Sequence, residues 1–305
     1  MSSRHKRRLL ALVPAAMTLT WALTGCGGGN TAGETGGKIS VVASTDVWGS
    51  VLAAVGGDNV QVTSIIHDPQ ADPHSYETTP QDAIAAQSAQ LTLANGGGYD
   101  DFFGRLADQA PQAKKLVACQ IGAIGTELNC DNNEHVWYDF ATVRKVADEV
   151  ATDLGQIQPA NAQKFTQNAA AFQGKLAGLE AKAQQAGAAH PDSKVVATEP
   201  VAHYLLDDAG ITDVTPQDFS KAVEDETDVP AAALAEVNAL IDGRQVKAVV
   251  NNAQTITPVT KQVVDKAKGA GLPVVDVTET LPAGATDYIS WMTGQVNALA
   301  GALNS

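Results

Sequence analysis

The sequence is poor in positive charge. It contains 20 Lys and Arg residues against 34 Asp and Glu residues, which gives a formal net charge of −14. Because nucleic-acid binding depends on basic side chains that neutralise phosphates, this balance argues against a nucleic-acid partner. A negative surface suits a cationic ligand but equally suits plain solubility, so the charge alone does not identify a ligand.

Long hydrophobic runs are also lacking. The longest apolar stretch, residues 9–21, follows the basic residues Arg4, Lys6, Arg7 and Arg8 and is short for a membrane span. This pattern predicts an export signal over residues 1–25. The small residues before Cys26 resemble the bacterial lipoprotein signal, in which the chain is cut before the cysteine and its thiol is lipidated. The alternative is an ordinary secretory signal peptide that is cut nearby, in which case Cys26 has no role in the processing.

Loss of residues 1–25 would remove four basic residues and no acidic ones. The remaining chain would carry 16 Lys and Arg against 34 Asp and Glu, a formal charge of −18. Residues 26–37 are rich in glycine and predict a flexible tether. The sequence therefore predicts a soluble body held at the membrane by a lipid anchor only.

Cysteine is scarce, with three residues in the chain. Besides Cys26 there are Cys119 and Cys130, and in an exported, disulfide-permissive protein we expect these two to bond to each other. Two free thiols or a soft metal site are the alternatives. Cys119 and Cys130 are far apart in the sequence and form no CxxC motif, so a cysteine metal site is the weaker of the two alternatives.

From residue 38 onwards, strand-like runs alternate with helical ones. This alternation predicts an α/β fold of two similar lobes, each with a mostly parallel sheet covered on both faces. We expect an N-terminal lobe over residues 38–138, a helical segment over 139–191 and a C-terminal lobe over 192–305. The expected strands are 39–44, 60–66, 89–94, 194–198, 211–214, 246–251 and 274–277, and the main expected helices are 47–55, 140–157, 161–186, 201–209, 230–242, 259–270 and 289–303.

The helix expected over residues 161–186 is unusually long. About 26 residues at 1.5 Å per residue rise about 39 Å, enough to run the length of a small domain. Such a helix could join the two lobes as a rigid backbone. A coiled-coil arm is the alternative, and the absence of a sustained heptad disfavours it.

Four potential metal ligands each follow a short strand-like run. Pro73 fixes its own φ and biases Asp72 towards an extended conformation, so the loop that carries the first ligand is partly set before any ion arrives. Imidazole and carboxylate groups suit divalent transition metals, and two carboxylates cancel the charge of an M²⁺ ion that is costly to bury. The four are His74, His135, Glu199 and Glu279.

These segments together resemble the zinc- or manganese-binding receptor lipoproteins of ABC importers, over residues 38–305. The resemblance lies in residues 72–77 with Pro80, in 134–137, in 198–200, in 224–226 ahead of Pro230, and in 278–280 ahead of 287–288. It implies two lobes bridged by one long helix, with a single ion in the cleft between them. It also implies that His74 and His135 bind from the N-terminal lobe and Glu199 and Glu279 from the C-terminal lobe. The implied partner is an ABC permease, and the implied state is a monomer on the outer face of the cytoplasmic membrane.

The choice of ion stays open between Mn²⁺ and Zn²⁺. Two His with two carboxylates favour Mn²⁺, and the stretch from Cys119 to Glu134 lacks the His-rich loop seen in many zinc members of the family. Zn²⁺, however, generally outcompetes Mn²⁺ at nitrogen and oxygen sites. His203, four residues after Glu199, is an alternative to Glu279 as the last ligand.

Two other functions have less support from the sequence than metal binding for import. A zinc-dependent hydrolase of the cell envelope would need an open coordination position and a general base. The sequence has no HExxH motif, and Glu77, three residues after His74, is the one base that could be argued. A surface adhesin has no support from repeats or a Pro-rich stalk. We therefore expect a binding protein and not an enzyme.

Overall fold

The computed structural model describes residues 37–69, 71, 73–122 and 133–305. Residues Gly36–Ser305 form one compact unit. The expected signal peptide with Cys26, the tether, Asp72 and Cys130 lie outside the described residues. None of the described helices combines the length and the apolar character needed to cross a membrane.

The first half of the described chain forms a four-stranded sheet in the order β2-β1-β3-β4, in which every strand pair is parallel. Parallel neighbours require crossover connections, and the helices between these strands supply them. The strands are β1 (Ile39–Thr45), β2 (Val60–Ile66), β3 (Leu91–Ala94) and β4 (Lys114–Val117), and the helices are α1 (Asp46–Gly56), α2 (Pro80–Gln87), α3 (Asp101–Ala107) and α4 (Ala118–Gly122). We call this part the N-terminal lobe.

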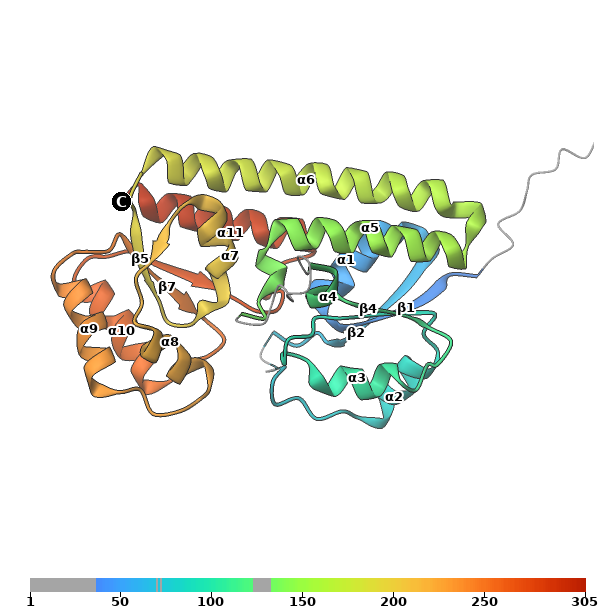
Figure 1. Ribbon diagram of the computed structural model, residues 1–305, viewed down its shortest axis with the longest axis horizontal. Coiled ribbons are helices and arrows are strands. Elements are labelled where there is room, and N and C mark those ends of the chain that lie inside the picture. The colour runs from blue at the N-terminus through green and yellow to red at the C-terminus, as the bar shows by residue number, and fades with distance from the viewer. Residues whose placement is uncertain (1–36, 70, 72, 123–132) are drawn as a thin grey trace, which may run out of the picture. The chain divides into compact units, whose positions relative to one another are not determined.

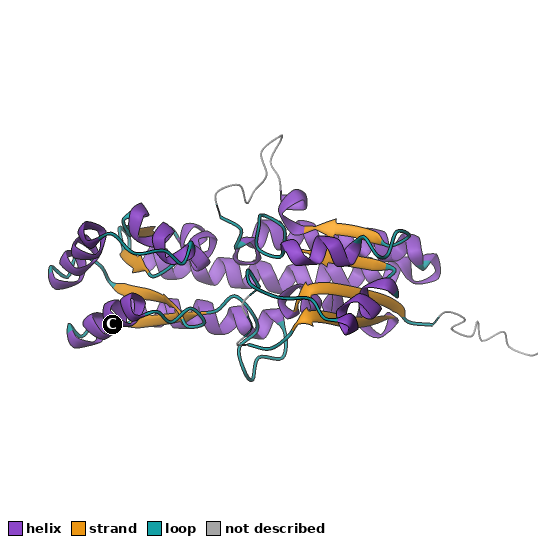
Figure 2. Cartoon of the chain, turned by 90° about the horizontal axis from the view of Figure 1, so that it is seen from below, coloured by secondary structure: helices purple, strands orange, loops and turns teal. Residues whose placement is uncertain are grey.

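The second half repeats the plan, with a parallel sheet in the order β6-β5-β7-β8. Figure 2 shows helices beside the strands of both sheets. The strands are β5 (Lys194–Ala197), β6 (Thr212–Asp213), β7 (Ala248–Asn252) and β8 (Val274–Val277), and the helices are α7 (His203–Ala209), α8 (Gln217–Glu224), α9 (Ala231–Asp242), α10 (Pro258–Gly269) and α11 (Tyr288–Leu303). We call this part the C-terminal lobe.

Two helices lie between the sheets in the sequence, α5 (Phe140–Ile157) and α6 (Ala162–Ala189). Asp139 begins α5 by accepting a hydrogen bond from the backbone N–H of Ala141, which satisfies one of the unpaired donors of the first turn. Helix α6 packs on α5, on α1 of the N-terminal lobe, and on α7 and α11 of the C-terminal lobe (Figure 1). One helix therefore contacts elements from both halves of the chain.

The side chains of each sheet divide between two cores because successive strand residues point to opposite faces. In β1, Val41 and Ala43 belong to a large core that also contains Phe165 and Leu176 of α6, whereas Val42 packs with the residues of α2 and α3. The second sheet behaves in the same way: Val195 joins the large core and its neighbour Val196 packs under α8, α9 and α10. The large core thus runs continuously from one sheet to the other.

The structure confirms the predicted fold class, and the long helix spans 28 residues, close to the expected range. Several short elements were not predicted, among them β4 and α8. Strand β4 begins with two lysines at the edge of the sheet, which hides its apolar alternation. Helix α8 has eight residues and three buried side chains, too short a pattern to separate from a loop.

Candidate metal site

The carboxyl ends of the strands carry the candidate site. His74 lies in the loop after β2, Glu199 follows β5 and Glu279 follows β8, while His135 comes shortly before α5. In open parallel sheets, ligands bind beyond the carboxyl ends of the strands, where the loops spread apart. Three of the four residues therefore lie at a ligand-binding edge of a sheet, whereas His135, contrary to the prediction, does not directly follow a described strand.

His74 is the most exposed of the predicted ligands. Its ring meets the buried ring of Tyr99 edge to face, with centroids 5.1 Å apart. Its Nε2 atom lies 3.9 Å from Oε1 of Glu134, and its side chain is 42% exposed. The loop ends where Thr79 and Asp82 form a capping box at the start of α2, so this end of the loop is held by reciprocal hydrogen bonds.

His135 is almost completely buried and its ring is held in one orientation. Its Nδ1 atom lies 2.7 Å from the side-chain oxygen of Asn133, which also accepts from the backbone N–H of His135. The amide nitrogen of Asn133 donates to the carbonyl of Pro200, so the amide oxygen is the atom that faces the imidazole. Since that oxygen can only accept, Nδ1 carries the hydrogen, and Nε2 of the neutral ring keeps a lone pair.

Electrostatics keep this imidazole neutral. Burial, together with the nearby charges of His74 and His203, lowers the pKa of His135 to about 3. A neutral imidazole with a fixed N–H on one nitrogen is the form that binds a metal through the other nitrogen. His135 therefore has the tautomer and the charge state of a metal ligand.

Asn252, the last residue of β7, joins the two predicted acidic ligands. Its side-chain nitrogen donates to a carboxylate oxygen of Glu199 and to Oε1 of Glu279, the latter at 2.7 Å. Burial raises the pKa of Glu199 to about 8, and the hydrogen bond from Asn252 opposes that rise while the charge of Glu279 adds to it. The structure thus brings Glu199 and Glu279 together.

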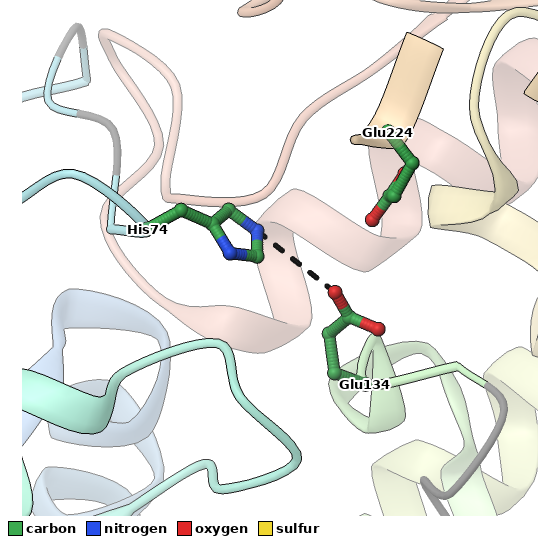
Figure 3. A group of neighbouring side chains, drawn as sticks. All are labelled: His74, Glu134 and Glu224. Atoms are coloured by element: carbon green, nitrogen blue, oxygen red, sulfur yellow. Dashed lines mark ion pairs between the residues drawn. The ribbon is translucent and has the colours of Figure 1, made fainter. Parts of the chain in front are cut away.

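Two further glutamates lie beside the two predicted histidine ligands. The side chains of Glu134 and Glu224 face His74, and all three offer ligand atoms within 4.8 Å of one another (Figure 3). Glu224 is the last residue of α8, and its Oε1 atom lies 3.7 Å from Nε2 of His135. Burial, together with the charges of Glu134, Glu199 and Glu279, raises the pKa of Glu224 to about 9.

The raised pKa values reflect an environment that favours positive charge. Several carboxyl groups share a partly buried volume, and Glu199 and Glu224 hold protons near neutral pH mainly because burial disfavours their charged forms, with repulsion between neighbouring carboxylates adding to this. A bound divalent cation supplies positive charge at such a place and takes over the role of those protons. The arrangement is chemically suited to an M²⁺ ion.

Polar side chains fix the loops that carry these groups. The side-chain amide of Asn95 donates to the backbone carbonyl of Glu134, and Trp48 donates to Asn95 in turn. Gln254 accepts from the backbone N–H groups of Glu279 and Thr280 and donates to the carbonyl of Pro69, in the loop that carries His74. Gln254 therefore links the two loops that hold the first and the last predicted ligand.

The roles of several of these residues were not predicted from the sequence. Glu134 and Glu224 stood within the segments of the family resemblance but were not identified as parts of the site. Asn252 and Gln254 were not considered, although a polar residue directly after the strand-like run 246–251 was a signal for Asn252. The functions of Glu134, Glu224 and Gln254 had no local signal because they depend on loops that meet only in the fold.

The remaining candidates are His203, Glu77 and the two cysteines. His203 pairs with Asp207 one helical turn further along α7, at 3.4 Å. Glu77, the possible base of a hydrolase, is exposed, and it is not part of the metal-ligand group found among the described residues. Cys119 is disulfide-bonded, and its predicted partner, Cys130, lies outside the described residues.

Comparison with known proteins agrees with this fold and identifies the family of the chain. The family described as "Zinc-uptake complex component A periplasmic" matches residues 41–302. The chain belongs to this family. It is 27% identical over 232 residues to the manganese-binding lipoprotein MntA of Halalkalibacterium halodurans, covering 70% of this chain and 77% of that protein. It is 26% identical over 269 residues to MntA of Bacillus subtilis, covering 85% of this chain and 86% of that protein.

A solved structure has the same fold as this chain. The periplasmic zinc-binding protein TroA of Treponema pallidum superposes with a TM-score of 0.73 at 20% identity, and the match covers 88% of this chain and 99% of TroA. At this identity the likeness concerns the fold alone. The two-lobed arrangement with parallel sheets is therefore shared with TroA.

Proposed function

We propose that this protein captures one divalent transition-metal ion, Mn²⁺ or Zn²⁺, outside the cytoplasmic membrane and delivers it to an ABC permease. The observation that carries the proposal is His135, a buried neutral imidazole whose ligand nitrogen faces a group of carboxyl side chains. Relatives named as manganese-binding lipoproteins and as metal ABC transporter substrate-binding lipoproteins support the same function.

In this proposal His74 and His135 bind from the N-terminal lobe, and Glu199 and Glu279 bind from the C-terminal lobe. The shared hydrogen bonds of Asn252 support the two acids as a pair. They also favour Glu279 over His203 as the last ligand, because His203 points to Asp207. The ion is the cargo, so the site must release it as well as bind it.

The proposed location follows from the amino-terminal sequence and the relatives. Cys26 would carry the lipid, residues 26–37 would be the tether, and the body would stand as a monomer on the outer face of the cytoplasmic membrane. A disulfide between Cys119 and Cys130 would suit that compartment. The names of the relatives as lipoproteins support the anchor.

Native mass spectrometry tests the function directly. The purified protein, stripped of metal and then offered Mn²⁺ or Zn²⁺, should take up one ion per molecule. His74→Ala and His135→Ala should each lose most of the uptake. His190→Ala is the matched control, because His190 is only partly buried and its ring hydrogen-bonds to Asn304 at the C-terminal end of the chain. A wild-type protein that takes up neither ion would refute the proposal.

A further inference from the structure

Glu224 lies where a ligand of the ion would lie, although it is outside the four proposed ligands. Its Oε1 atom is 3.7 Å from Nε2 of His135, which is longer than a hydrogen bond of about 3 Å. Because Nδ1 of His135 donates to Asn133, both facing atoms carry lone pairs when Glu224 is ionised, which is the form of a carboxyl group that binds a metal. Such atoms repel each other unless positive charge lies between them.

The distances fit a shared ion. With metal–ligand bonds of about 2.1 Å, two ligand atoms lie about 3.0 Å apart at a right angle and about 4.2 Å apart across the ion. The 3.7 Å between Glu224 and His135 falls within this range, as does the 3.9 Å between Glu134 and His74. The largest separation within the group of His74, Glu134 and Glu224 is 4.8 Å or less, so only a small adjustment would bring the three to one centre.

Glu224 is also carried by a well-anchored element. Helix α8 buries Phe219, Ala222 and Val223 against the core of the C-terminal lobe. After the helix, Thr227 donates a backbone hydrogen bond to the carbonyl of Ala222, which fixes the turn that follows Glu224. Precise ligand placement requires such rigid support, and an exposed surface acid lacks it.

We propose that Glu224 is an additional ligand of the captured ion and that it selects an ion of high coordination number, of the Mn²⁺ class, over Zn²⁺. The proposal rests on the proposed function, because it concerns the same site. Zn²⁺ is saturated by four ligands in a tetrahedron, whereas ions of the Mn²⁺ class take about six ligands and favour carboxylate oxygen. A fifth protein ligand that is a carboxylate therefore adds more to the binding of Mn²⁺ than to that of Zn²⁺.

Competition binding with Glu224→Gln tests the selectivity. The affinity of the full-length protein for Mn²⁺ should fall about 10- to 100-fold, while the affinity for Zn²⁺ should change by less than about threefold. Glu236→Gln is the matched control, since it removes the same charge from an exposed position on α9 and should leave both affinities unchanged. Equal losses for the two ions, or no loss for either, would overturn the proposal.

A second variant separates ligation from simple charge. Glu224→Asp keeps the carboxylate but shortens its reach, so it should behave like Glu224→Gln if Glu224 is a ligand. Wild-type binding by Glu224→Asp would contradict ligation.

Co²⁺ provides an independent readout, because its visible absorption is weak at six-coordinate sites and strong at four-coordinate ones. The absorption of the wild-type complex should be weak and should rise in Glu224→Gln. If the wild-type protein binds no metal at all, the proposed function fails, whereas unchanged Mn²⁺ binding by Glu224→Gln refutes only this inference.

Discussion

The Nδ1 atom of His135 lies 2.7 Å from the side-chain oxygen of Asn133. This contact determines which nitrogen of the buried imidazole can bind a metal, because the other nitrogen keeps its lone pair. Asn133 also donates to the carbonyl of Pro200, which directly follows Glu199. One amide side chain therefore orients a proposed ligand of the N-terminal lobe and contacts the backbone beside a proposed ligand of the C-terminal lobe.

Replacement of Asn133 should weaken metal binding without removing any proposed ligand. Asn133→Ala leaves the imidazole N–H without its acceptor, and the metal affinity should fall about 10- to 100-fold, as for other residues that orient metal-binding histidines. Asn133→Asp restores an acceptor and should retain more affinity than Asn133→Ala. Isothermal titration with the proposed ions would measure both, and equal affinities for wild type and Asn133→Ala would contradict this role.

Replacement of Asn252 should destabilise the protein because Glu199 and Glu279 lose a shared donor. We expect Asn252→Ala to lower the free energy of unfolding of the metal-stripped protein by about 2 kcal/mol, because two buried carboxyl oxygens lose their hydrogen-bond donor. Asn251→Ala is the control, since the neighbouring side chain bonds to Asp276 at an exposed position. Urea denaturation would show whether the loss is confined to Asn252→Ala.

The contact between α6 and α7 depends on the absence of a side chain at Gly187. A Cβ atom there would lie 1.6 Å from the carbonyl oxygen of Ala209. Gly187→Ala should therefore lower the free energy of unfolding by about 2 to 3 kcal/mol through overpacking. Gly178→Ala, in the same helix with no atom within 4 Å of the added carbon, should instead raise stability by up to about 1 kcal/mol. Thermal unfolding of both variants would show opposite shifts.

Asp208 of α7 should make stability depend on pH. Burial and the charges of Glu180 and Asp139 raise its pKa to about 6, while Arg144 opposes the rise. Its Oδ2 atom is buried and makes no hydrogen bond with the described residues. Because the native state binds this proton more tightly than the unfolded state, the contribution to stability is greatest below pH 4 and is lost as the pH rises to about 6.

Asp208→Asn should remove this dependence. The variant should be more stable than wild type above pH 7 by about 1 kcal/mol, a figure reduced for partial solvent exposure. The difference should shrink as the pH falls from 6 to 4. Urea denaturation across this pH range would measure it, and a constant difference at every pH would show that another group titrates.

Much of the fold followed from local patterns. Runs such as Val60–Ile66 and helices such as Phe140–Ile157 lie at the predicted positions, since apolar periodicity and capping residues act over short stretches of chain. Short elements at a sheet edge or on the surface escaped prediction. Strand β4 and helix α8 have too few buried residues to show a period, and their stability comes from the neighbours on which they pack.

The candidate metal site could likewise be predicted only in part from the sequence. The positions of His74, Glu199 and Glu279 after strands could be predicted, because the carboxyl ends of parallel strands meet at one edge of a sheet. The grouping of Glu134 with Glu224 could not, since one follows the N-terminal sheet and the other ends a helix of the second lobe, 90 residues later in the numbering. The sequence around Glu134 and the sequence around Glu224 contain no pattern that indicates that the two side chains lie close together in the fold.

The sequence by itself determined the alternation of strands and helices, the long α6 and the residue types available to bind an ion, because these depend on contacts between residues close in the chain. The tertiary structure alone decided that Asn252 links Glu199 to Glu279 and that Glu224 faces His135. Those contacts join strands, loops and a helix end that are far apart in the chain. Their physical cause is the packing of the two sheets on one continuous core.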